Sequence, residues 1–167
     1  MTDDPNRDAE IEAKFWTALR KDMTVMLSIV EPTKVAPRPM TALLDGKDDQ
    51  GPVWFFGSQS SELAKHSISP AKAGFTFVGK GHGVWATVEG HLVVDMNRAK
   101  IDALWNPHVA AWYKEGKDDP DLCLLRFDPA EAEIWLDGSS LVAGIKALLG
   151  ADPQADYRKN KAEVSLG

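Results

Sequence analysis

Residues 54–67 read WFFGSQSSELAKHS, and this run changes character at Gly57. The residues before Gly57 are typical of a buried strand, whereas those after it are typical of a loop that opens a helical turn at Ser61. The start of a helix leaves backbone N–H groups without partners, which favours a bound anion. Two interpretations stay open: a turn capped by serine with a solvated lysine, or a cradle for an anion such as phosphate. The side-chain donors of such a cradle would be Ser58, Ser60, Ser61 and Lys65.

The segments around this run alternate between strand-like and helical patterns. Strand-like patterns cover residues 24–30, 38–45, 53–57, 73–79, 83–95, 121–128 and 132–137, with a bend or bulge expected at Gly90. Helical patterns cover residues 8–21, 61–66, 97–105, 107–113 and 139–150. The connections between residues 24 and 57 are too short for crossover helices, which predicts a β-meander there. The whole pattern predicts a mainly β fold: a small antiparallel barrel of six or seven strands with helices outside it.

The composition is that of one globular domain. The chain has 167 residues, 44% of them apolar and 26% charged, which is the balance of one domain with a hydrophobic core. An acidic N-terminus and a charged tail from Ala151 are expected to be flexible. The net charge of −6 argues against nucleic acid or a membrane as partner, because both select a dense basic surface. No apolar run could span a bilayer and no signal-peptide pattern is present, so a cytoplasmic location is expected.

Side chains that could carry chemistry are dispersed. The four histidines are His66, His82, His91 and His108. They lack the spacing of metal ligands, and GSQSS is not a G-x-S-x-G elbow, so neither a metal site nor a hydrolase triad is predicted. Cys123 alternates with leucines, which favours a core thiol over a nucleophile. The glycine-rich stretch GKGHG (79–83) could approach a ligand closely, but a loop joining two strands is the favoured interpretation.

Arg38 shifts the balance toward the anion cradle. If residues 38–45 and 53–57 pair as a hairpin across the turn GKDDQGP (46–52), Arg38 and Ser58 lie at the same end of the sheet. The arginine fork could then join the serine loop around one phosphate, a geometry that lysine alone does not give. The alternative is a surface charge at a strand edge.

Four stretches together resemble the general stress protein branch of the pyridoxamine 5′-phosphate oxidase-like superfamily, the FMN-binding split barrels. They are RPMTALLDG (38–46), VWFFGSQSSELAK (53–65), GFTFVGKGH (74–82) and DPDLCLLRFDPAEAEIW (119–135). The resemblance covers about residues 10–150, which is the expected core. It implies a six-stranded antiparallel split β-barrel with flanking helices. It also implies a homodimer that holds FMN, with FAD as the alternative, at two sites between the subunits.

The resemblance also implies where the cofactor would lie. The residues at the flavin phosphate would be Arg38, Gly57, Ser58, Ser60, Ser61 and Lys65. Those beside the ring system would be Pro39, Met40, Thr41, Lys80, Gly81 and His82. The aromatic candidates near the flavin from the second subunit would be Trp112 and Trp135.

The function expected from this resemblance is flavin binding, with a redox role in the stress response. One alternative is a flavin reductase or other oxidoreductase that uses NADH or NADPH. Another is a split barrel that has lost flavin and acts as a binding module. The C-terminal signature of the true oxidases is absent, so pyridoxamine 5′-phosphate oxidation is not expected. No residue identifies itself as an acid, base or nucleophile, and no catalytic residue is assigned.

Overall fold

The structure of the protein is a computed structural model, which describes residues 4–46, 50–137, 148, 150, 158 and 160–167. Within these residues, eight strands form one antiparallel sheet. The strands are β1 (Thr24–Glu31), β2 (Val35–Thr41), β3 (Leu43–Leu44), β4 (Val53–Ser58), β5 (Ala71–Val78), β6 (Val84–Val94), β7 (Leu122–Leu136) and β8 (Lys161–Ser165). The helices are α1 (Pro5–Asp22), α2 (Glu62–Lys65), α3 (Arg98–Leu104) and α4 (Pro107–Ala110), with 3₁₀ turns at Lys80–His82 and Gly116–Asp118.

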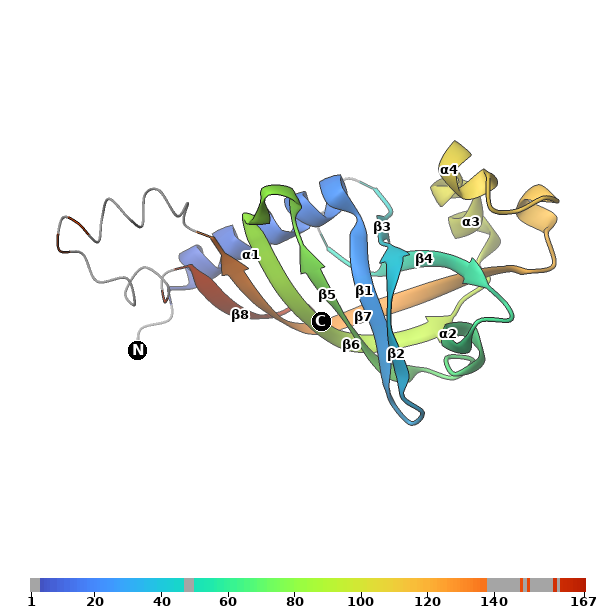
Figure 1. Cartoon of the computed structure of the whole chain (residues 1–167), viewed down its shortest axis with the longest axis horizontal. Coiled ribbons are helices and arrows are strands. Elements are labelled where there is room, and N and C mark those ends of the chain that lie inside the picture. Colours follow the sequence, from blue (N-terminus) through green and yellow to red (C-terminus); the bar gives the residue numbers. More distant parts are fainter. Residues whose placement is uncertain (1–3, 47–49, 138–147, 149, 151–157, 159) are drawn as a thin grey trace.

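The sheet curls until its two ends meet. The strand order is β2-β1-β5-β6-β7-β4-β3, and β8 pairs with the far half of β7. Figure 1 shows the strong twist of these strands and the helices outside them. The strands β2 and β4 contact each other but do not pair. The Met40 methyl group lies 3.9 Å from the position that a Cβ would take on Gly57. The predicted class of antiparallel barrel with flanking helices is confirmed, although the described residues contain eight strands and not six.

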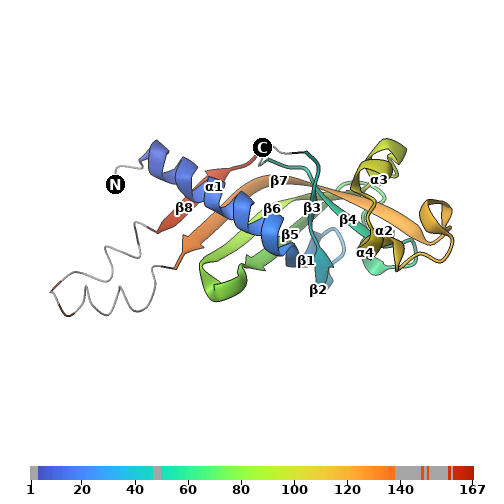
Figure 2. The same cartoon turned by 90° about the horizontal axis from the view of Figure 1, so that it is seen from above.

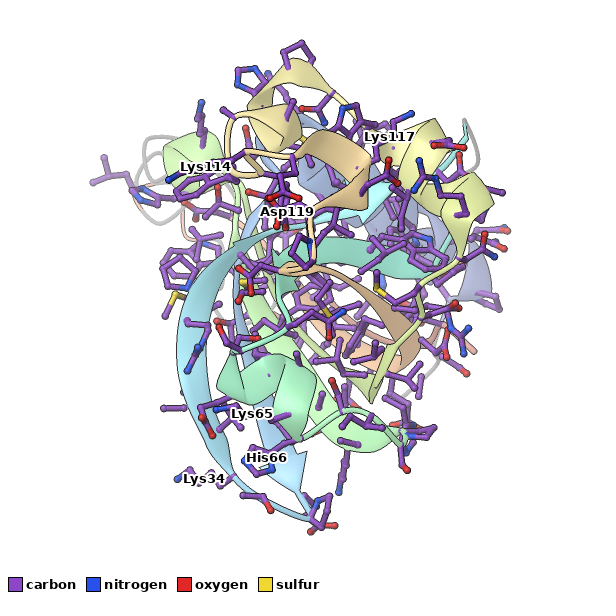
Figure 3. The ribbon with its side chains drawn as sticks, turned by 90° about the vertical axis from the view of Figure 1, so that its right-hand side faces the viewer. Lys34, Lys65, His66, Lys114, Lys117 and Asp119 are labelled. Atoms are coloured by element: carbon purple, nitrogen blue, oxygen red, sulfur yellow. The ribbon has the colours of Figure 1, made fainter. Side chains whose placement is uncertain are left out.

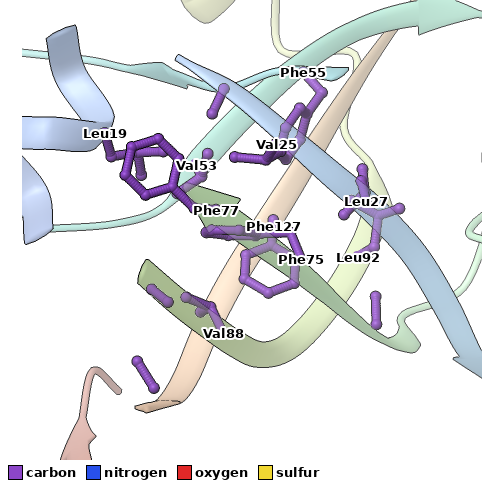
Figure 4. Packing of buried hydrophobic residues seen from close by; sticks show 14 of the residues in the cluster. Leu19, Val25, Leu27, Val53, Phe55, Phe75, Phe77, Val88, Leu92 and Phe127 are labelled. Atoms are coloured by element: carbon purple, nitrogen blue, oxygen red, sulfur yellow. The ribbon is translucent and has the colours of Figure 1, made fainter. Parts of the chain in front are cut away.

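The barrel core comes from the alternation of apolar and polar residues along the strands. In β5, Ala71, Ala73, Phe75 and Phe77 are buried, and the residues between them face outward. Figure 4 shows how these side chains meet those of β1, β4 and β7. Phe75 packs edge-on against Phe127 of β7, with ring centroids 5.2 Å apart. Each buried aromatic or aliphatic side chain of this kind contributes about 1.5–3 kcal/mol to stability.

The helix α1 covers one opening of the barrel. It begins after Asp4, whose carboxylate accepts from the Asn6 N–H group, and it ends at Met23, which is in the left-handed conformation. Its apolar face buries Ile11, Phe15, Trp16 and Leu19 against β6, β7 and β8. Figure 2 shows the helix lying across the strands. No described helix is both long enough and apolar enough to cross a membrane.

The strand β6 bends at Gly90, as its sequence predicts. The register with β7 shifts between Glu89 and Gly90. A Cβ on Gly90 would lie only 2.2 Å from the Asp128 carbonyl oxygen, so only glycine allows the two strands to approach here. Its partner β7 runs unbroken through residues 122–136, where two separate strands were expected.

Three predictions from the sequence need correction or fall outside the structure. The β-meander is wrong: β2 pairs with β1, and only Leu43–Leu44 pair with β4, because β4 reaches across to β7. The expected loose tail is wrong for Lys161–Ser165, which pair with β7 and place Ala162 in the core. The predicted helix at 139–150 lies outside the described residues, apart from residues 148 and 150.

Candidate functional site

Arg38 and the serine loop lie at the same end of the barrel. The strands β2 and β4 run in opposite directions, and Met40 lies beside Gly57, so Arg38 falls next to the segment that follows Gly57. The predicted placement therefore holds, but it arises from closure of the barrel and not from a hairpin between these two segments.

The Arg38 side chain turns toward the interior. Arg38 stands opposite Leu27 in the β1–β2 register, and cross-strand partners share a face of the sheet. Leu27 is fully buried, so Arg38 also faces inward. The Arg38 Nε atom is buried without a hydrogen-bond partner. Buried polar atoms in native proteins are normally paired, so this donor is an exception among the described residues, as is Trp54 Nε1.

The serine loop is a closed set of hydrogen bonds. The Ser58 hydroxyl donates to Asp121 Oδ1 at 2.6 Å and accepts from the Ser60 backbone N–H at 3.1 Å. The Ser58 and Ser60 hydroxyl oxygens are 2.8 Å apart. A serine hydroxyl has one proton to give, so Ser60 is the donor to Ser58. Ser58 is thus engaged by an acidic side chain that the sequence did not identify, and Ser60 is engaged by Ser58.

The capped-turn interpretation describes Ser61 and Lys65. The Ser61 hydroxyl accepts from the Ala64 N–H at 3.1 Å, which makes it the cap of α2. Lys65 Nζ lies 3.3 Å from Glu62 Oε1, and His66 Nε2 lies 3.1 Å from Glu62 Oε2. The hydrogen bond and charge of Lys65, followed by those of His66, hold the pKa of Glu62 below its ordinary value. Figure 3 looks onto this end and shows Lys65 and His66 at α2, below Asp119.

Backbone and side-chain contacts fix the loop to β7 and to the segment before it. The Gln59 N–H donates to the Asp121 carbonyl at 2.8 Å, and Gln59 Nε2 donates to the Leu122 carbonyl at 3.0 Å. The Tyr113 hydroxyl donates to the Gly57 carbonyl at 2.7 Å. Burial, followed by the nearby Cys123 thiol and acidic side chains, raises the pKa of Tyr113 to about 12. The loop is therefore held rigidly from one side.

A small helical lobe carries Tyr113. It comprises α3, α4 and the turn at residues 116–118, and its second hydrophobic cluster packs against β4 and the start of β7. The helices begin at Asn97 and Asn106, whose side chains accept backbone N–H groups. The buried members of the cluster are Trp54, Ile101, Leu104, Val109, Tyr113, Leu122 and Leu124. Trp112, predicted to lie near a flavin, is 84% exposed on this lobe.

The GKGHG stretch is the hairpin between β5 and β6, as favoured from its sequence. Gly81 and His82 have positive φ values of 77° and 59°, and the Gly79 N–H donates to the Val84 carbonyl. Asp22 of α1 accepts from the Lys80 N–H at 2.8 Å, which ties the hairpin to the helix. The His82 ring stacks on Trp85, with centroids 5.7 Å apart.

The predicted cofactor residues therefore separate into two groups within one chain. Figure 1 places the β5–β6 hairpin at one end of the sheet and α2 with the lobe at the other. The first end holds Thr41, Lys80, Gly81, His82 and Trp135, and the second holds Arg38, Gly57, Ser58, Ser60, Ser61, Lys65 and Trp112. Pro39 and Met40 lie between them on β2. Along β2, Arg38 and Thr41 are three residues apart, which is about 10 Å.

The outer face of the sheet is apolar near the hairpin. Met26, Val78 and Trp85 are 40%, 41% and 44% exposed. Val78 and Trp135 stand opposite Trp85 on its two sides, and a groove runs between these strands. Side chains of this size are usually covered when they gather on one face, so this face is suited to a protein partner.

The thiol and the acidic side chains do not form a further site. Cys123 is fully buried, and burial, followed by the charge of Asp121, raises its pKa to about 11. The prediction of a core thiol is therefore confirmed. Among the residues that the structure describes, no group of three or more His, Cys, Asp or Glu side chains could hold a metal ion.

Sequence reasoning missed Asp121 and Tyr113 as parts of the loop. Asp121 directly precedes β7, and Leu122 is the partner of Ser58. The pairing of β4 with β7 joins segments more than sixty residues apart, which a strand pattern alone does not reveal. The one signal in the sequence for Asp121 was its place as a polar residue directly before a run that reads as a buried strand.

The chain is similar to a family model and to solved structures. The model described as pyridoxamine 5′-phosphate oxidase like matches residues 10–155. The general stress FMN/FAD binding protein of Xanthomonas citri is 44% identical, over 79% of this chain and 92% of that one, with a TM-score of 0.73. A general stress family protein of Xanthomonas campestris pv. campestris is 45% identical, over 83% and 93%, with a TM-score of 0.74.

A third solved structure covers nearly the whole chain. It is a general stress protein 26 of a Jannaschia species, 29% identical over 94% of this chain and 99% of that one, with a TM-score of 0.77. No curated protein matches the chain significantly.

Proposed function

The chain belongs to the pyridoxamine 5′-phosphate oxidase like family, in its general stress protein branch, and from this premise we propose that it binds a flavin. The Xanthomonas citri relative is described as an FMN/FAD binding protein and covers most of this chain. We propose FMN as the ligand and FAD as the alternative. The observation that carries the proposal is the buried, unpartnered Nε atom of Arg38.

The phosphate end of the flavin would lie against Arg38. This guanidinium faces inward at the end of the barrel where the serine loop lies, and its Nε donor has no protein acceptor. An arginine fork binds phosphate through charge-assisted hydrogen bonds, which are stronger than neutral ones. The remaining loop residues that the family pattern suggests, Ser58, Ser60, Ser61 and Lys65, are already engaged within the protein. Arg38 is therefore the residue on which we expect phosphate affinity to depend most.

The ring system would extend from Arg38 along Pro39–Thr41. Arg38 is aligned through Leu27 with Phe75, five residues before Lys80, so the hairpin residues Lys80–His82 of the same chain lie about 17 Å further along the strand direction. We propose that a second copy of the chain supplies them, so that the flavin lies between two subunits of a homodimer. The apolar outer face around Val78 and Trp85 supports this proposal, because exposed apolar side chains that gather on one face are usually buried against a partner.

A bound flavin would supply electron transfer, and the protein would bind and orient it. Within this chain, Arg38 would hold the phosphate, and Tyr113 would hold the Gly57 carbonyl and thus the loop. No side chain is assigned a role in proton transfer. Pyridoxamine 5′-phosphate oxidation forms no part of the proposal.

The test is a titration of the purified protein with FMN, FAD and riboflavin, followed by flavin fluorescence and absorbance. FMN should bind, and R38A should weaken it by about tenfold or more, as expected from the roughly 1.5–3 kcal/mol of a charged hydrogen bond. Riboflavin, which has no phosphate, should be insensitive to R38A. The matched control is R98A, because Arg98 pairs with Asp118 on the lobe surface. A wild-type protein that stays colourless after incubation with each flavin and desalting would refute the proposal.

A further inference from the structure

The hairpin between β5 and β6 has a conformation that needs support from outside it. Gly81 and His82 have positive φ values of 77° and 59°. For a residue with a Cβ, such as His82, the left-handed conformation is uncommon, so surrounding contacts must hold it. The His82 N–H donates to the Gly79 carbonyl, and the Gly79 N–H donates to the Val84 carbonyl, both at 2.9 Å. These bonds close the turn, but they do not fix its direction relative to the barrel.

Asp22, the last residue of α1, fixes that direction. Its Oδ2 atom accepts from the Lys80 N–H at 2.8 Å, and it lies 3.4 Å from the position that a Cβ would take on Gly79. The helix itself is anchored in the barrel, where Phe15 packs edge-on against Phe77 of β5 with ring centroids 6.1 Å apart. The carboxylate is therefore brought to the hairpin by a helix whose apolar face is buried in the core.

The carboxylate of Asp22 is poorly placed for the stability of α1. The C-terminus of a helix carries a partial negative charge, so an acidic side chain there is unfavourable. Arg20 and Lys21, the basic residues of this last turn, have the favourable sign. The end of the helix is capped by backbone, since the Met23 N–H donates to the Leu19 carbonyl. The contact that Asp22 makes thus serves the hairpin and not the helix.

We propose that Asp22 is a positioning residue for the flavin ring. By holding the Lys80 N–H, it keeps Lys80–His82 in the shape in which these residues would meet the ring of a flavin bound by a second copy of the chain. The inference rests on the proposed function and adds to it a residue that acts through the hairpin. Arg38 would set the affinity for the phosphate, and Asp22 the affinity for the ring that FMN and riboflavin share.

The variant D22A tests the inference, because it removes the acceptor of the Lys80 N–H. Two quantities are measured: the hydrogen-exchange rate of the Lys80 amide without flavin, followed by NMR, and the dissociation constants for FMN and riboflavin, from fluorescence titration. The amide should exchange faster, and both flavins should bind about fivefold more weakly, as the loss of one hydrogen bond predicts. In contrast, R38A should weaken the binding of FMN alone.

The conservative variant D22N separates the hydrogen bond from the charge. It keeps an oxygen that accepts from the Lys80 N–H, so it should retain slow exchange and wild-type binding of both flavins. The control E10A removes an exposed carboxylate from an earlier turn of α1 and should change neither measurement. Thermal melts should show that D22A is folded, because the substitution removes an unfavourable charge from the end of α1. Light scattering should show that it is still a dimer.

The outcomes distinguish this inference from the proposed function. If the wild type binds FMN and folded D22A binds both flavins as tightly, the inference is wrong and the proposed function stands. A loss confined to FMN, an equal loss in D22N, or unchanged exchange at Lys80 would also overturn it, because none of these follows from the hydrogen bond to the hairpin. An unfolded or monomeric D22A would overturn it too, since the flavin would then be lost with the fold or the subunit interface. If the wild type binds no flavin, the proposed function and the inference fail together.

Discussion

The hydroxyl of Tyr113 donates a 2.7 Å hydrogen bond to the carbonyl of Gly57, and this bond joins the helical lobe to the end of β4. We expect Y113F to lower the free energy of unfolding by about 1 kcal/mol, the usual worth of such a bond. Urea unfolding followed by circular dichroism measures the change. The control W112F alters a neighbouring side chain that is 84% exposed, and it should leave the unfolding midpoint in place. Equal midpoints for Y113F and W112F would show that the bond adds nothing to stability.

Alkaline pH should weaken the fold through Cys123 and Tyr113. Burial raises the pKa values of these groups to about 11 and about 12, so both bind their protons more tightly in the folded than in the unfolded chain. Their contribution is complete below the unfolded pKa values and is lost as the pH rises through the folded ones. The free energy of unfolding should therefore fall between about pH 9 and pH 12.

Variants separate this effect from the titration of lysines. Urea unfolding at several pH values should give a shallower decline for C123A between about pH 9 and pH 11 than for the wild type. Y113F should flatten the decline at higher pH. Parallel curves for the wild type and both variants would contradict the assignment of the effect to these two groups.

Substitution by alanine should be destabilising at Gly90 and tolerated at Gly57. A Cβ on Gly90 would lie 2.2 Å from the Asp128 carbonyl oxygen, whereas a Cβ on Gly57 would meet side-chain atoms at 3.7 Å and 3.9 Å. We expect G90A to lower the free energy of unfolding by about 3 kcal/mol or more, because the clash is with backbone. G57A should be tolerated. A thermal melt of G90A close to that of G57A would show that β6 can shift away from β7.

The proposed homodimer can be tested on the apolar outer face. Light scattering after size exclusion should give the wild type about twice the chain mass of 18.3 kDa. W85E places a charge in the middle of this face and should give a monomer, since Trp85 is 44% exposed and its removal leaves the core intact. The control E89Q changes an outward residue two positions beyond Thr87 on the same strand and should remain dimeric. A monomeric wild type would refute the dimer and leave the flavin proposal to be judged by titration.

Local patterns predicted most strands because each strand buries every second residue. The alternation of Phe75 and Phe77 and the glycine at position 90 identified β5 and the bend of β6 correctly. The strand β8 was missed, because only Ala162 and Val164 pack inward within a charged tail, and small side chains give a weak periodic signal. Two strands were predicted at 121–128 and 132–137, yet β7 continues through Pro129 between them.

The site was predicted less completely, because it depends on which strands become neighbours. Arg38 and Ser58 were placed at the same end of the sheet through a hairpin that does not form. The actual cause is closure of the barrel, which brings Met40 to Gly57. Asp121 could not be connected to Ser58 without the register of β4 with β7, and this register is set by packing between distant segments.

The strand β7 belongs to both hydrophobic clusters of the molecule. Its side chains alternate between them: Cys123, Leu125 and Phe127 pack into the barrel, while Leu122 and Leu124 pack into the lobe. Loss of either cluster would therefore expose one face of the same strand. The barrel and the lobe should melt together in a single cooperative transition, so that the fold and the loop beside Arg38 are lost at one temperature.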